Sequence, residues 1–493
     1  MKTLRPYQQK AKSDTYNSIN QGNRCVMLQL ATGGGKTFIS SSIAGDVLSK
    51  DKKVLFIVDG ITLSDQTYSA FTQDLGVPVG VIQGNNYELF DAAAPVQVAT
   101  IQTLRARQKS EGFWEWLDEF GVVFIDEAHV LHTFAKEIMK TVKCPVIGLS
   151  ATPWAKGLGD HFDDLIIGCP MSQLINDEYL CDYEAYSTGQ PNLKGVSLSN
   201  GDYNQKEVEH RYDGKLVNKI VETTLKHAKG KQIMLAASTV DQSKQFAKLF
   251  CEAGIKAEHI DGYGSSPKEI LEKERTMRRF LSKETQMLTN VNRAVKGFDY
   301  PEIELLVVCR PTKSLMFWTQ LFGRCLRTHP SKDKAIVLDF AGNLEALGRP
   351  EDILITKLSK GERIDQANKA VRKDKPCPGQ NGGCGFIFKG ALCPQCGHDR
   401  TPKEGEIEYV DAELVKIDKK ALKLQSLKDE FKSGLLYHAE KYNKPDYYAN
   451  WIYRKKFKED ADFTGVAPAY SEAAFRFATA GMHFKKKYSK KRR

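Results

Sequence analysis

The chain has 493 residues, 41% of them hydrophobic and 27% charged, which is enough for several domains and excludes a disordered protein as the default. No apolar run forms a signal peptide or approaches the length of a bilayer span, so we expect an intracellular, cytoplasmic protein without a membrane partner. The net charge is +11, but the last nine residues contain seven basic residues and no acidic one, so a cationic tail suited to polyanions or to solubility carries much of it.

Short β-type runs alternate with helix-type segments through much of the chain. The first series includes "VMLQL", "KVLFIVD" and "VVFIDE", and the second includes "QIMLAAS", "ELLVVCR" and "AIVLDF". This alternation predicts α/β domains in which helices cover parallel sheets. We expect such domains at residues 1–170 and 216–343, joined by a linker at 171–215.

The pattern changes after residue 343. We expect a charged connector at 344–376, a cysteine module at 377–398 and a basic helical region at 399–493 that ends in the cationic tail. In the helical region, apolar residues recur at steps of three and four, as on one face of a helix: Leu414, Ile417, Ala421, Leu424, Leu427, Phe431 and Leu435.

A glycine-rich loop follows the first apolar run, in "LATGGGKTF". A strand, glycines and then a helix form the context in which main-chain N–H groups surround a phosphate, and Gly33, Gly34 and Gly35 permit its close approach. Lys36 would neutralise the β- and γ-phosphates of ATP, and the hydroxyl of Thr37 would bind Mg²⁺.

Two carboxylates follow the apolar strand in "VVFIDEAH". Adjacent buried carboxylates are unfavourable unless they meet cations, so we expect Asp126 to face the Mg²⁺ held by Thr37. Glu127 is then placed to orient and deprotonate the attacking water. His129 follows, and the chemistry alone leaves open a purely structural hydrogen-bonding role for it.

With these motifs, residues 1–343 resemble superfamily-two helicases of the DEAH-box type, in the order of that family. The resemblance implies two tandem RecA-like parallel-sheet domains, followed here by the small zinc module and the basic helical region. It also implies contacts with the nucleotide from Gln8 in "LRPYQ", as the adenine reader, and from Gly297 and Asp299 in "VKGFDYPE". Ser150 and Thr152 in "SAT" would couple the two domains together with His129.

The segment "QLFGRCLR" fits the sixth motif of the family through Gln320, Gly323, Arg324 and Arg327. An arginine supplied from the second domain stabilises charge on the γ-phosphate and is worth roughly 10³–10⁵ in rate in related phosphoryl transfers. We therefore assign catalytic roles to Gln320, Arg324 and Arg327 beside Glu127. A surface helix whose arginines pair with acids is the alternative.

The resemblance also assigns contacts with the nucleic-acid backbone to Thr100, Gln102 and Thr103 of "TIQTL" and to Thr289 and Asn290. Contacts of this type fix a strand with little sequence preference. As residues at strand ends they could equally be caps.

The chain departs from the family pattern at two places. Leu30 stands where the strict phosphate loop has a glycine, and Asp59 and Gly60 stand where the family has proline and arginine after the second strand. A phosphate contact from that arginine is therefore missing.

Closer similarity is to RadD-like bacterial DNA-repair helicases and related phage helicases, through "LLVVCRPTKSLMFWTQLFGRCLR" and "VLDFAGN". It implies an ATP-dependent DNA helicase or translocase of repair, recombination or replication, associated with the nucleoid in a bacterial or phage setting. One alternative is a nucleic-acid-stimulated ATPase that remodels duplex or protein–DNA complexes without separating strands. A nucleic-acid-binding scaffold with a silent motor is another, and RNA in place of DNA stays open.

Four cysteines cluster after the second domain, at Cys377, Cys384, Cys393 and Cys396. Thiolates at this spacing can complete a tetrahedral Zn²⁺ site, and so short a segment would scarcely fold without one. A redox pair or an iron–sulfur cluster is the alternative.

Aromatic and basic residues interleave in "PDYYANWIYRKKFK". Rings that stack on bases beside cations that meet phosphates favour a nucleic-acid surface that includes Arg454, Lys455 and Lys456. The aromatic residues fit a helical core equally well. We expect the main partner to be single-stranded, duplex or branched DNA, with a protein partner at the zinc module or the tail as a further candidate.

Overall fold

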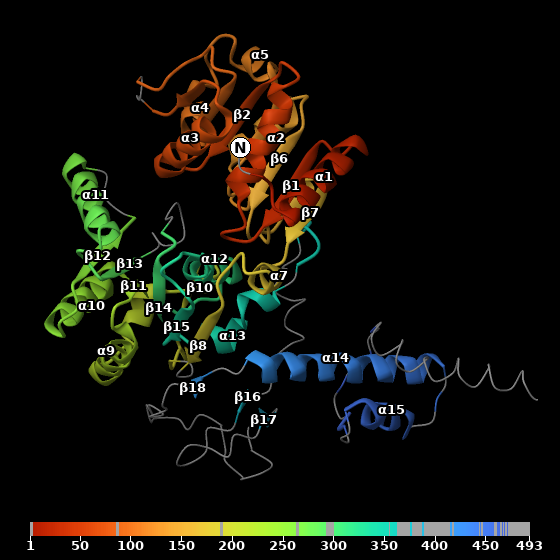
Figure 1. Cartoon of the computed structure of the whole chain (residues 1–493), viewed down its shortest axis with the longest axis vertical. Helices are drawn as coiled ribbons and strands as arrows, with labels where there is room; N and C mark the ends of the chain where they lie inside the picture. The colour runs from red at the N-terminus through yellow and green to blue at the C-terminus, as the bar shows by residue number, and fades with distance from the viewer. Residues whose placement is uncertain are drawn as a thin grey trace, which may run out of the picture. The chain divides into compact units, whose positions relative to one another are not determined.

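The computed structural model describes residues 3–84, 88–187, 191–262, 266–291, 300–353, 355–361, 375–376, 387–388, 415–416, 419–442, 444, 447–457, 461–463, 466, 468 and 471. By its internal contacts the chain divides into two compact units, residues 1–415 and 416–493. The first unit holds two α/β lobes (Figure 1). Within the described residues, no helix is both long and apolar enough to cross a membrane.

The apolar runs of the first lobe form a seven-stranded sheet in the order β3-β4-β2-β5-β6-β1-β7. Every pairing in it is parallel. The central strands are continuously apolar because both faces of a parallel sheet are buried. The strands are β1 (Cys25–Leu30), β2 (Lys53–Val58), β3 (Val79–Ile82), β4 (Val96–Thr100), β5 (Phe120–Ile125), β6 (Val146–Ser150) and β7 (Asp164–Cys169).

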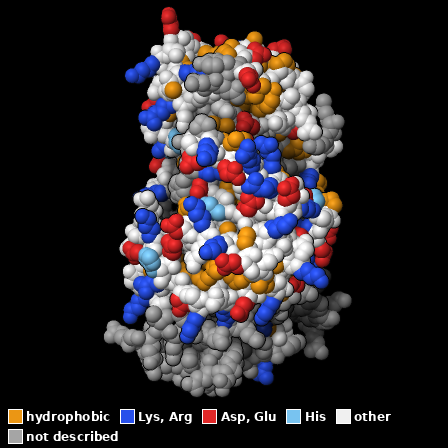
Figure 2. Space-filling view, turned by 90° about the vertical axis from the view of Figure 1, so that its left-hand side faces the viewer, with side chains coloured by type: hydrophobic (Ala, Val, Ile, Leu, Met, Phe, Trp, Pro, Cys, Tyr) orange, Lys and Arg blue, Asp and Glu red, His pale blue; other side chains and the backbone are white. Residues whose placement is uncertain are grey.

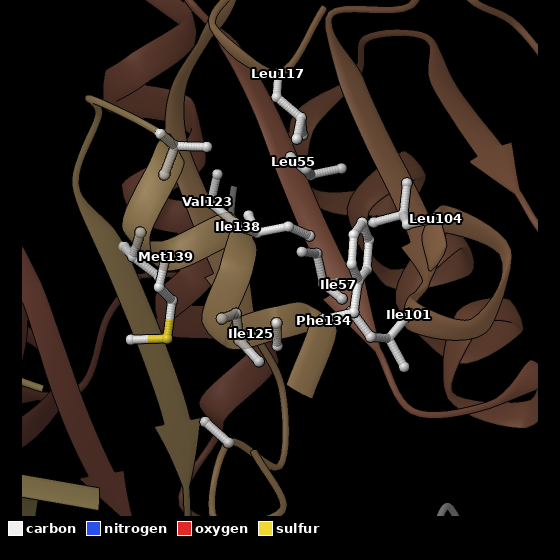
Figure 3. Close-up of a cluster of buried hydrophobic side chains, with 14 of the residues drawn as sticks. Leu55, Ile57, Ile101, Leu104, Leu117, Val123, Ile125, Phe134, Ile138 and Met139 are labelled. Atoms are coloured by element: carbon white, nitrogen blue, oxygen red, sulfur yellow. The ribbon is translucent and has the colours of Figure 1, made fainter. Parts of the chain in front are cut away.

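Helices cover both faces of this sheet, as the alternation of side chains along β2 shows. Leu55 and Ile57 enter a buried cluster with α4, α5 and α6 (Figure 3), whereas Phe56 between them contacts Phe71 of α3 at a ring distance of 5.1 Å. The helices of this lobe are α1 (Pro6–Asn20), α2 (Lys36–Leu48), α3 (Ile61–Leu75), α4 (Ile101–Arg107), α5 (Phe113–Leu117), α6 (Thr133–Thr141), η1 (Leu158–Asp160) and α7 (Met171–Asn176).

The second lobe repeats this architecture with the strand order β12-β13-β11-β14-β15-β8-β18. The pairings among its first six strands are parallel. The expectation of two RecA-like parallel sheets is therefore confirmed. The strands are β8 (Tyr183–Ser187), β11 (Gln232–Ala237), β12 (Ala257–Asp261), β13 (Met287–Val291), β14 (Ile303–Cys309), β15 (Ala335–Asp339) and β18 (Val415–Lys416).

The helices of the second lobe lie between its strands in the sequence, as βαβ units require. They are α8 (Gln205–Glu209), α9 (Gly214–Ala228), α10 (Val240–Glu252), α11 (Pro267–Leu281), α12 (Leu315–Cys325), α13 (Asn343–Leu347) and η3 (Pro350–Asp352), beside the short antiparallel pair β9 (Leu198–Ser199) and β10 (Asp202–Tyr203).

The segment expected as a linker, residues 171–215, contains regular structure. Its strand β8 lies between β15 and β18 in the second sheet and pairs with β15, with Tyr183 opposite Ala335. The sequence did not reveal this strand, because five residues carry a weak pattern of their own and a polar, glycine-containing stretch follows them. The second sheet thus begins well before residue 216.

The chain leaving the second lobe returns to the first lobe. Leu358 packs against the buried cluster shown in Figure 3, and the Gly159 N–H donates to the carbonyl of Ser359 at 2.8 Å. The expected connector at 344–376 therefore begins as a segment that contacts both lobes.

Charges of both signs are interleaved on the face shown in Figure 2. Helix α11, at the left edge of Figure 1, turns toward the viewer there, and its exposed ion pairs include Arg275–Glu272 and Arg278–Glu274, each at 3.7 Å. Exposed ion pairs contribute about 0–1 kcal/mol to stability. The charges on α11 are therefore explained by their contact with solvent.

The second unit contains two helices, α14 (Lys419–Lys441) and α15 (Tyr447–Phe457). Phe431 and Leu435 of α14 pack against Ala449, Ile452 and Tyr453 of α15 in a small apolar cluster. The helical character expected for this region holds for these residues, and the aromatic ring of Tyr453 belongs to the core. The described residues before it include the two-residue strands β16 (Lys375–Pro376) and β17 (Ile387–Phe388), which pair antiparallel.

Candidate active site

The glycine-rich loop connects the end of β1 to the start of α2. Gly35 caps α2 with a left-handed backbone at φ 82°, a conformation that favours glycine, and α2 begins at Lys36. A side chain at Gly35 would also collide with the amide of Gln8. The loop therefore presents the N-terminus of α2, with Lys36 and Thr37 in its first turn, as an anion site requires.

The segment around Gln8 is bound directly to this loop. The Gln8 amide and the Tyr7 hydroxyl both donate to the carbonyl of Gly34, at 3.2 and 2.8 Å. The side-chain oxygen of Gln8 accepts from the Arg5 N–H at 3.0 Å, and the Arg5 guanidinium lies 4.4 Å from the ring centre of Tyr179. Gln8 is thus held at the phosphate loop, and its role as the adenine reader stays a prediction.

Lys36 lies between the two carboxylates that follow β5. Its ammonium donates to Glu127 Oε1 at 2.8 Å and lies 3.9 Å from Asp126 Oδ1. Glu127 has a left-handed backbone at φ 46°, uncommon for a residue with a side chain, which sets its carboxylate at the end of the strand.

Burial and charge affect these two carboxyl groups in opposite directions. Burial raises the pKa of Asp126 above its ordinary value in spite of Lys36. Burial alone would also raise the pKa of Glu127, but the Lys36 ammonium and His129 outweigh it and hold that pKa well below its usual range. The pKa of Lys36, which burial alone would lower, is raised because Glu127 and Asp126 attract its charge. The Lys36–Glu127 pair is therefore firmly ionised.

The residues at this edge fit a bound Mg²⁺ ion. Asp126 Oδ1 is buried and accepts no hydrogen bond from a described residue, and the Lys36 ammonium stays 3.9 Å away from it. A buried carboxylate oxygen in this state is stabilised when a cation binds to it directly. Thr37 stands in the first turn of α2 on the same loop as Lys36, which reaches Asp126. Carboxylate and hydroxyl oxygens, completed by phosphate and water, are the donors that Mg²⁺ prefers.

A buried hydrogen-bond network runs from Glu127 into the second lobe. His129 Nδ1 lies 3.2 Å from Glu127 Oε2 and 3.0 Å from the Ser150 hydroxyl. The Gln320 amide of α12 donates to the Thr152 hydroxyl at 3.0 Å and lies 3.4 Å from His129 Nε2. The structure thus brings together the residues expected to couple the lobes and one of those expected to be catalytic.

The arginine segment lies against the phosphate loop. Arg324 is 8% exposed, and Asp126 and Glu127 are near enough to oppose the lowering of its pKa by burial. Arg327 passes beside Gly33, where an added Cβ would stand 3.5 Å from its Cγ, and burial lowers its pKa to about 10. At Gly323, a Cβ would stand 2.8 Å from that of Thr32, so only glycine permits this approach of α12.

The first group of expected nucleic-acid contacts is largely turned inward. The hydroxyls of Thr100 and Thr103 are buried and lie 2.8 Å apart, and Thr103 also accepts from the Gly84 N–H at 2.7 Å. Gln102 is exposed and donates to Asp59 Oδ1 at 2.9 Å, where the ring nitrogen Nε2 of His132 lies 3.1 Å away. The acid that replaces the proline of the family therefore engages Gln102.

Thr289 and Asn290 of β13 are also buried. The Thr289 hydroxyl donates to the Ser243 carbonyl at 2.9 Å, and the Asn290 amide donates to the Leu235 carbonyl at 2.9 Å. Their side chains serve the packing of the second lobe, so a contact with nucleic acid would use the main chain.

Several expected residues lie outside the described part of the chain. They are Gly297 and Asp299 of the fifth motif and the four cysteines, Cys377, Cys384, Cys393 and Cys396. Among the described residues, no group of three or more His, Cys, Asp or Glu side chains is arranged to hold a metal. Arg454, Lys455 and Lys456 are exposed on the last turns of α15.

The structure adds residues that sequence reasoning missed. Tyr7 binds Gly34, Thr32 faces Gly323, and Leu180 lies where a Cβ on Gly33 would meet its Cδ2 at 2.9 Å. Tyr7 could have been found from its position next to Gln8. Leu180 carries no local signal, because it acts only through the return of the chain to the loop.

Two family models match the chain. One, described as the res subunit of type III restriction enzymes, matches residues 1–155. The other, described as the helicase conserved C-terminal domain, matches residues 215–329. They cover the two lobes and the motifs described above.

Known proteins resemble the chain over most of its length. A 51.5 kDa protein of a Lactococcus phage is 30% identical over 413 residues, 82% of this chain and 85% of that protein. The ATP-dependent helicase IRC3 of Saccharomyces cerevisiae is 29% identical over 69% of this chain, but the match spans only 51% of the yeast protein. A fragment of an HsdR subunit of a type I restriction enzyme from Vibrio vulnificus shares the fold, with a TM-score of 0.55 at 18% identity over 71% of this chain and 66% of that fragment.

The chain belongs to the superfamily-two helicases and is a helicase-family ATPase.

Proposed function

We propose that this superfamily-two ATPase is a DNA helicase or translocase of the RadD-like type, acting in repair, recombination or replication. ATP would bind between the lobes, with its phosphates at Gly33–Thr37 and its adenine at Gln8. Hydrolysis would change the contact between the lobes, so that a strand bound across both is alternately gripped and released.

One observation carries this proposal, the Gln320 side chain. Its amide joins α12 of the second lobe to Thr152 and approaches His129, which in turn contacts Glu127. A buried residue of the second lobe therefore touches the network of the expected general base in the first. Such a link supports hydrolysis that depends on the position of the second lobe.

The Lys36–Glu127 pair supports a role for Glu127 that changes when ATP binds. A phosphate in the loop would compete with Glu127 for the Lys36 ammonium, which lies 2.8 Å from Oε1. Once this cation turns to phosphate, burial is no longer outweighed by it and the pKa of Glu127 rises, making the carboxylate a better acceptor of a proton from water. Mg²⁺ held by Asp126 and Thr37 would supply charge stabilisation at the phosphates.

The arginines complete the proposed site from the second lobe. Arg324 lies near both carboxylates, and Arg327 passes beside Gly33. A guanidinium kept charged in a buried cleft can stabilise the negative charge that develops on the transferred phosphoryl group. We assign this role to Arg324 and Arg327.

The proposal for DNA draws on the closer resemblance and on exposed cations. Arg454, Lys455 and Lys456 are assigned to phosphate contacts, Gln102 and the main chain near Thr100 and Thr289 to the strand track, and the four cysteines to a Zn²⁺ site.

The decisive experiment measures ATP turnover by the full chain with single-stranded, duplex and forked DNA and with RNA, each at 50 and 200 mM salt because backbone contacts are salt-dependent. Strand displacement and triplex displacement are followed in the same reactions, with E127Q as the inactive control. DNA-stimulated turnover with strand displacement supports a helicase. Triplex displacement alone supports a translocase that remodels duplex or protein–DNA complexes.

Other outcomes would reject the proposal. Stimulation by RNA and none by DNA would reassign the substrate. Nucleic-acid binding without any stimulation of ATP turnover would favour the scaffold with a silent motor.

A further inference from the structure

A lysine that no sequence motif singled out is buried beneath the end of the arginine helix. Lys332 is 7% exposed and follows the turn that leaves α12. The turn closes with a hydrogen bond from the Lys332 N–H to the His329 carbonyl at 3.0 Å and returns the side chain toward the helix. A buried ammonium is costly unless its protons are taken up by acceptors.

Three main-chain carbonyls accept from this ammonium. Two belong to the end of the arginine helix, Cys325 and Arg327, the latter at 3.0 Å, and the third is that of Pro301 at 3.4 Å. Helix α12 ends at Cys325, so the carbonyls at this point lack partners within the helix, and a cation there meets the negative end of the helix dipole. Lys332 is therefore the C-terminal cap of α12.

This cap joins two segments that belong to the proposed site. Arg324 is in the last turn of α12, and Arg327 comes two residues after its last residue, Cys325. Pro301 belongs to the fifth motif, "VKGFDYPE", two residues after Asp299 and two before the start of β14. One ammonium thus joins the end of the sixth motif to the end of the fifth.

The opposite side of the arginine segment is held by the connection between the lobes. The Cys181 N–H donates to the Leu326 carbonyl at 2.8 Å, and Leu180 forms an antiparallel bridge with Arg327. Leu180 in turn lies against Gly33 of the phosphate loop. A shift at the end of α12 would therefore displace Leu180 and, through it, change the contact with Gly33 of the phosphate loop.

We propose that Lys332 is a positioning residue for ATP hydrolysis, because its ammonium fixes the end of α12 and with it the placement of Arg324 and Arg327 against the phosphate loop. This inference rests on the catalytic role proposed above for the two arginines. Lys332 touches no substrate. Its loss should raise the barrier of the chemical step more than it weakens ATP binding, since a small misplacement of a group that acts in the transition state lowers kcat.

The test compares K332M, which keeps an apolar stem of similar length, with K334M, at the exposed Lys334 directly before β15. For K332M we expect kcat for ATP to fall about ten- to a hundredfold with KM changed less than about threefold. K334M should keep the kcat of the wild type. Thermal unfolding of both variants and binding of a fluorescent ATP analogue verify that the site is intact.

A double-mutant cycle separates positioning from a general structural effect. If Lys332 acts through the arginines, K332M should lower kcat less than about twofold further in an R324A/R327A background. Independent, multiplying losses would overturn the inference, as would a wild-type kcat for K332M. If K332M fails to fold, K332R takes its place, and its retained charge should keep kcat within about fivefold of wild type. A folded K332R with a larger loss is tested in the same cycle with R324A/R327A. Non-additive losses there support the positioning role, and additive losses overturn it.

The two proposals fail in different ways. A wild-type kcat for R324A/R327A would reject the role of the arginines and with it the premise for Lys332. A depressed kcat for R324A/R327A beside a normal K332M would reject Lys332 alone.

Discussion

The carboxyl edges of the two sheets use buried acids in contrasting ways. In the first lobe, Asp126 and Glu127 follow β5 and face the ammonium of Lys36. In the second lobe, Asp339 ends β15 and accepts main-chain N–H groups of Ala341 and Leu344, at 3.0 and 2.7 Å. Asp126 and Glu127 thus face an ammonium that the phosphates of ATP could also bind, whereas Asp339 accepts a hydrogen bond at the start of α13.

The difference teaches where chemistry resides in a duplicated fold. The acids of the first lobe are held by side chains that can change partners. Asp339 is held by main-chain groups that cannot move without unfolding the turn. The second lobe therefore contributes to the proposed site from a helix, α12, whose placement depends on packing and capping.

The largest effect is expected at the acid that faces Lys36. E127Q removes the proposed general base but keeps the size and a hydrogen-bond acceptor for Lys36, so kcat should fall about 10²- to 10⁴-fold while ATP binding persists. Turnover and nucleotide binding are measured in parallel. E119Q, at an exposed acid beside the start of the same strand, should retain full turnover.

The capping acid of the second lobe should affect stability in place of turnover. Burial raises the pKa of Asp339 from 3.8 to about 6, so the folded chain binds more protons than the unfolded chain between these values. The contribution of Asp339 to the free energy of unfolding should therefore fall by about 2 kcal/mol as the pH rises from about 4 to about 6.

D339N should flatten this pH dependence, whatever its effect on absolute stability. Urea unfolding across that pH range measures it, with D333N at an exposed position as the control that keeps the slope. An unchanged slope in D339N would show that the acid is not the titrating group.

The approach of α12 to the phosphate loop can be blocked sterically. G323A places a Cβ 2.8 Å from that of Thr32, and overpacking of this kind costs about 1–3 kcal/mol, so we expect ATP turnover to fall about tenfold or more. G45A is matched to it, because that helical glycine has only ordinary contact with Leu75 at 3.7 Å. It should leave turnover unchanged and raise stability by up to about 1 kcal/mol. Equal turnover in the two variants would contradict the close approach.

The smallest effect should come from the single hydrogen bond across the lobes. Q320A removes the donor to Thr152, worth about 1 kcal/mol, so nucleic-acid-stimulated turnover should fall about five- to tenfold while turnover without nucleic acid changes less. Q173A, at an exposed glutamine of α7, is the control. If stimulated and unstimulated turnover fall in the same ratio, Gln320 does not couple the lobes.

The parallel sheets of the molecule were predictable because β1, β2 and β5 are buried on both faces and therefore apolar throughout. Lys36, Asp126 and Glu127 were predictable for a related reason. Strand ends of a parallel sheet meet at one edge, so polar residues directly after apolar runs must lie near one another. The strand β8 was missed, because it is short and its flanks resemble a linker.

The sequence by itself determined which groups could bind phosphate and magnesium, since these depend on residue types at the ends of strands and the start of one helix. Tertiary structure decided that Thr100 and Thr289 turn inward, that Leu180 rests on Gly33 and that Lys332 caps the arginine helix. These contacts join residues far apart in the chain. They are stabilised by burial and by hydrogen bonds to main-chain groups, which are present at every position of every sequence. No local pattern records which of those acceptors a given side chain will reach.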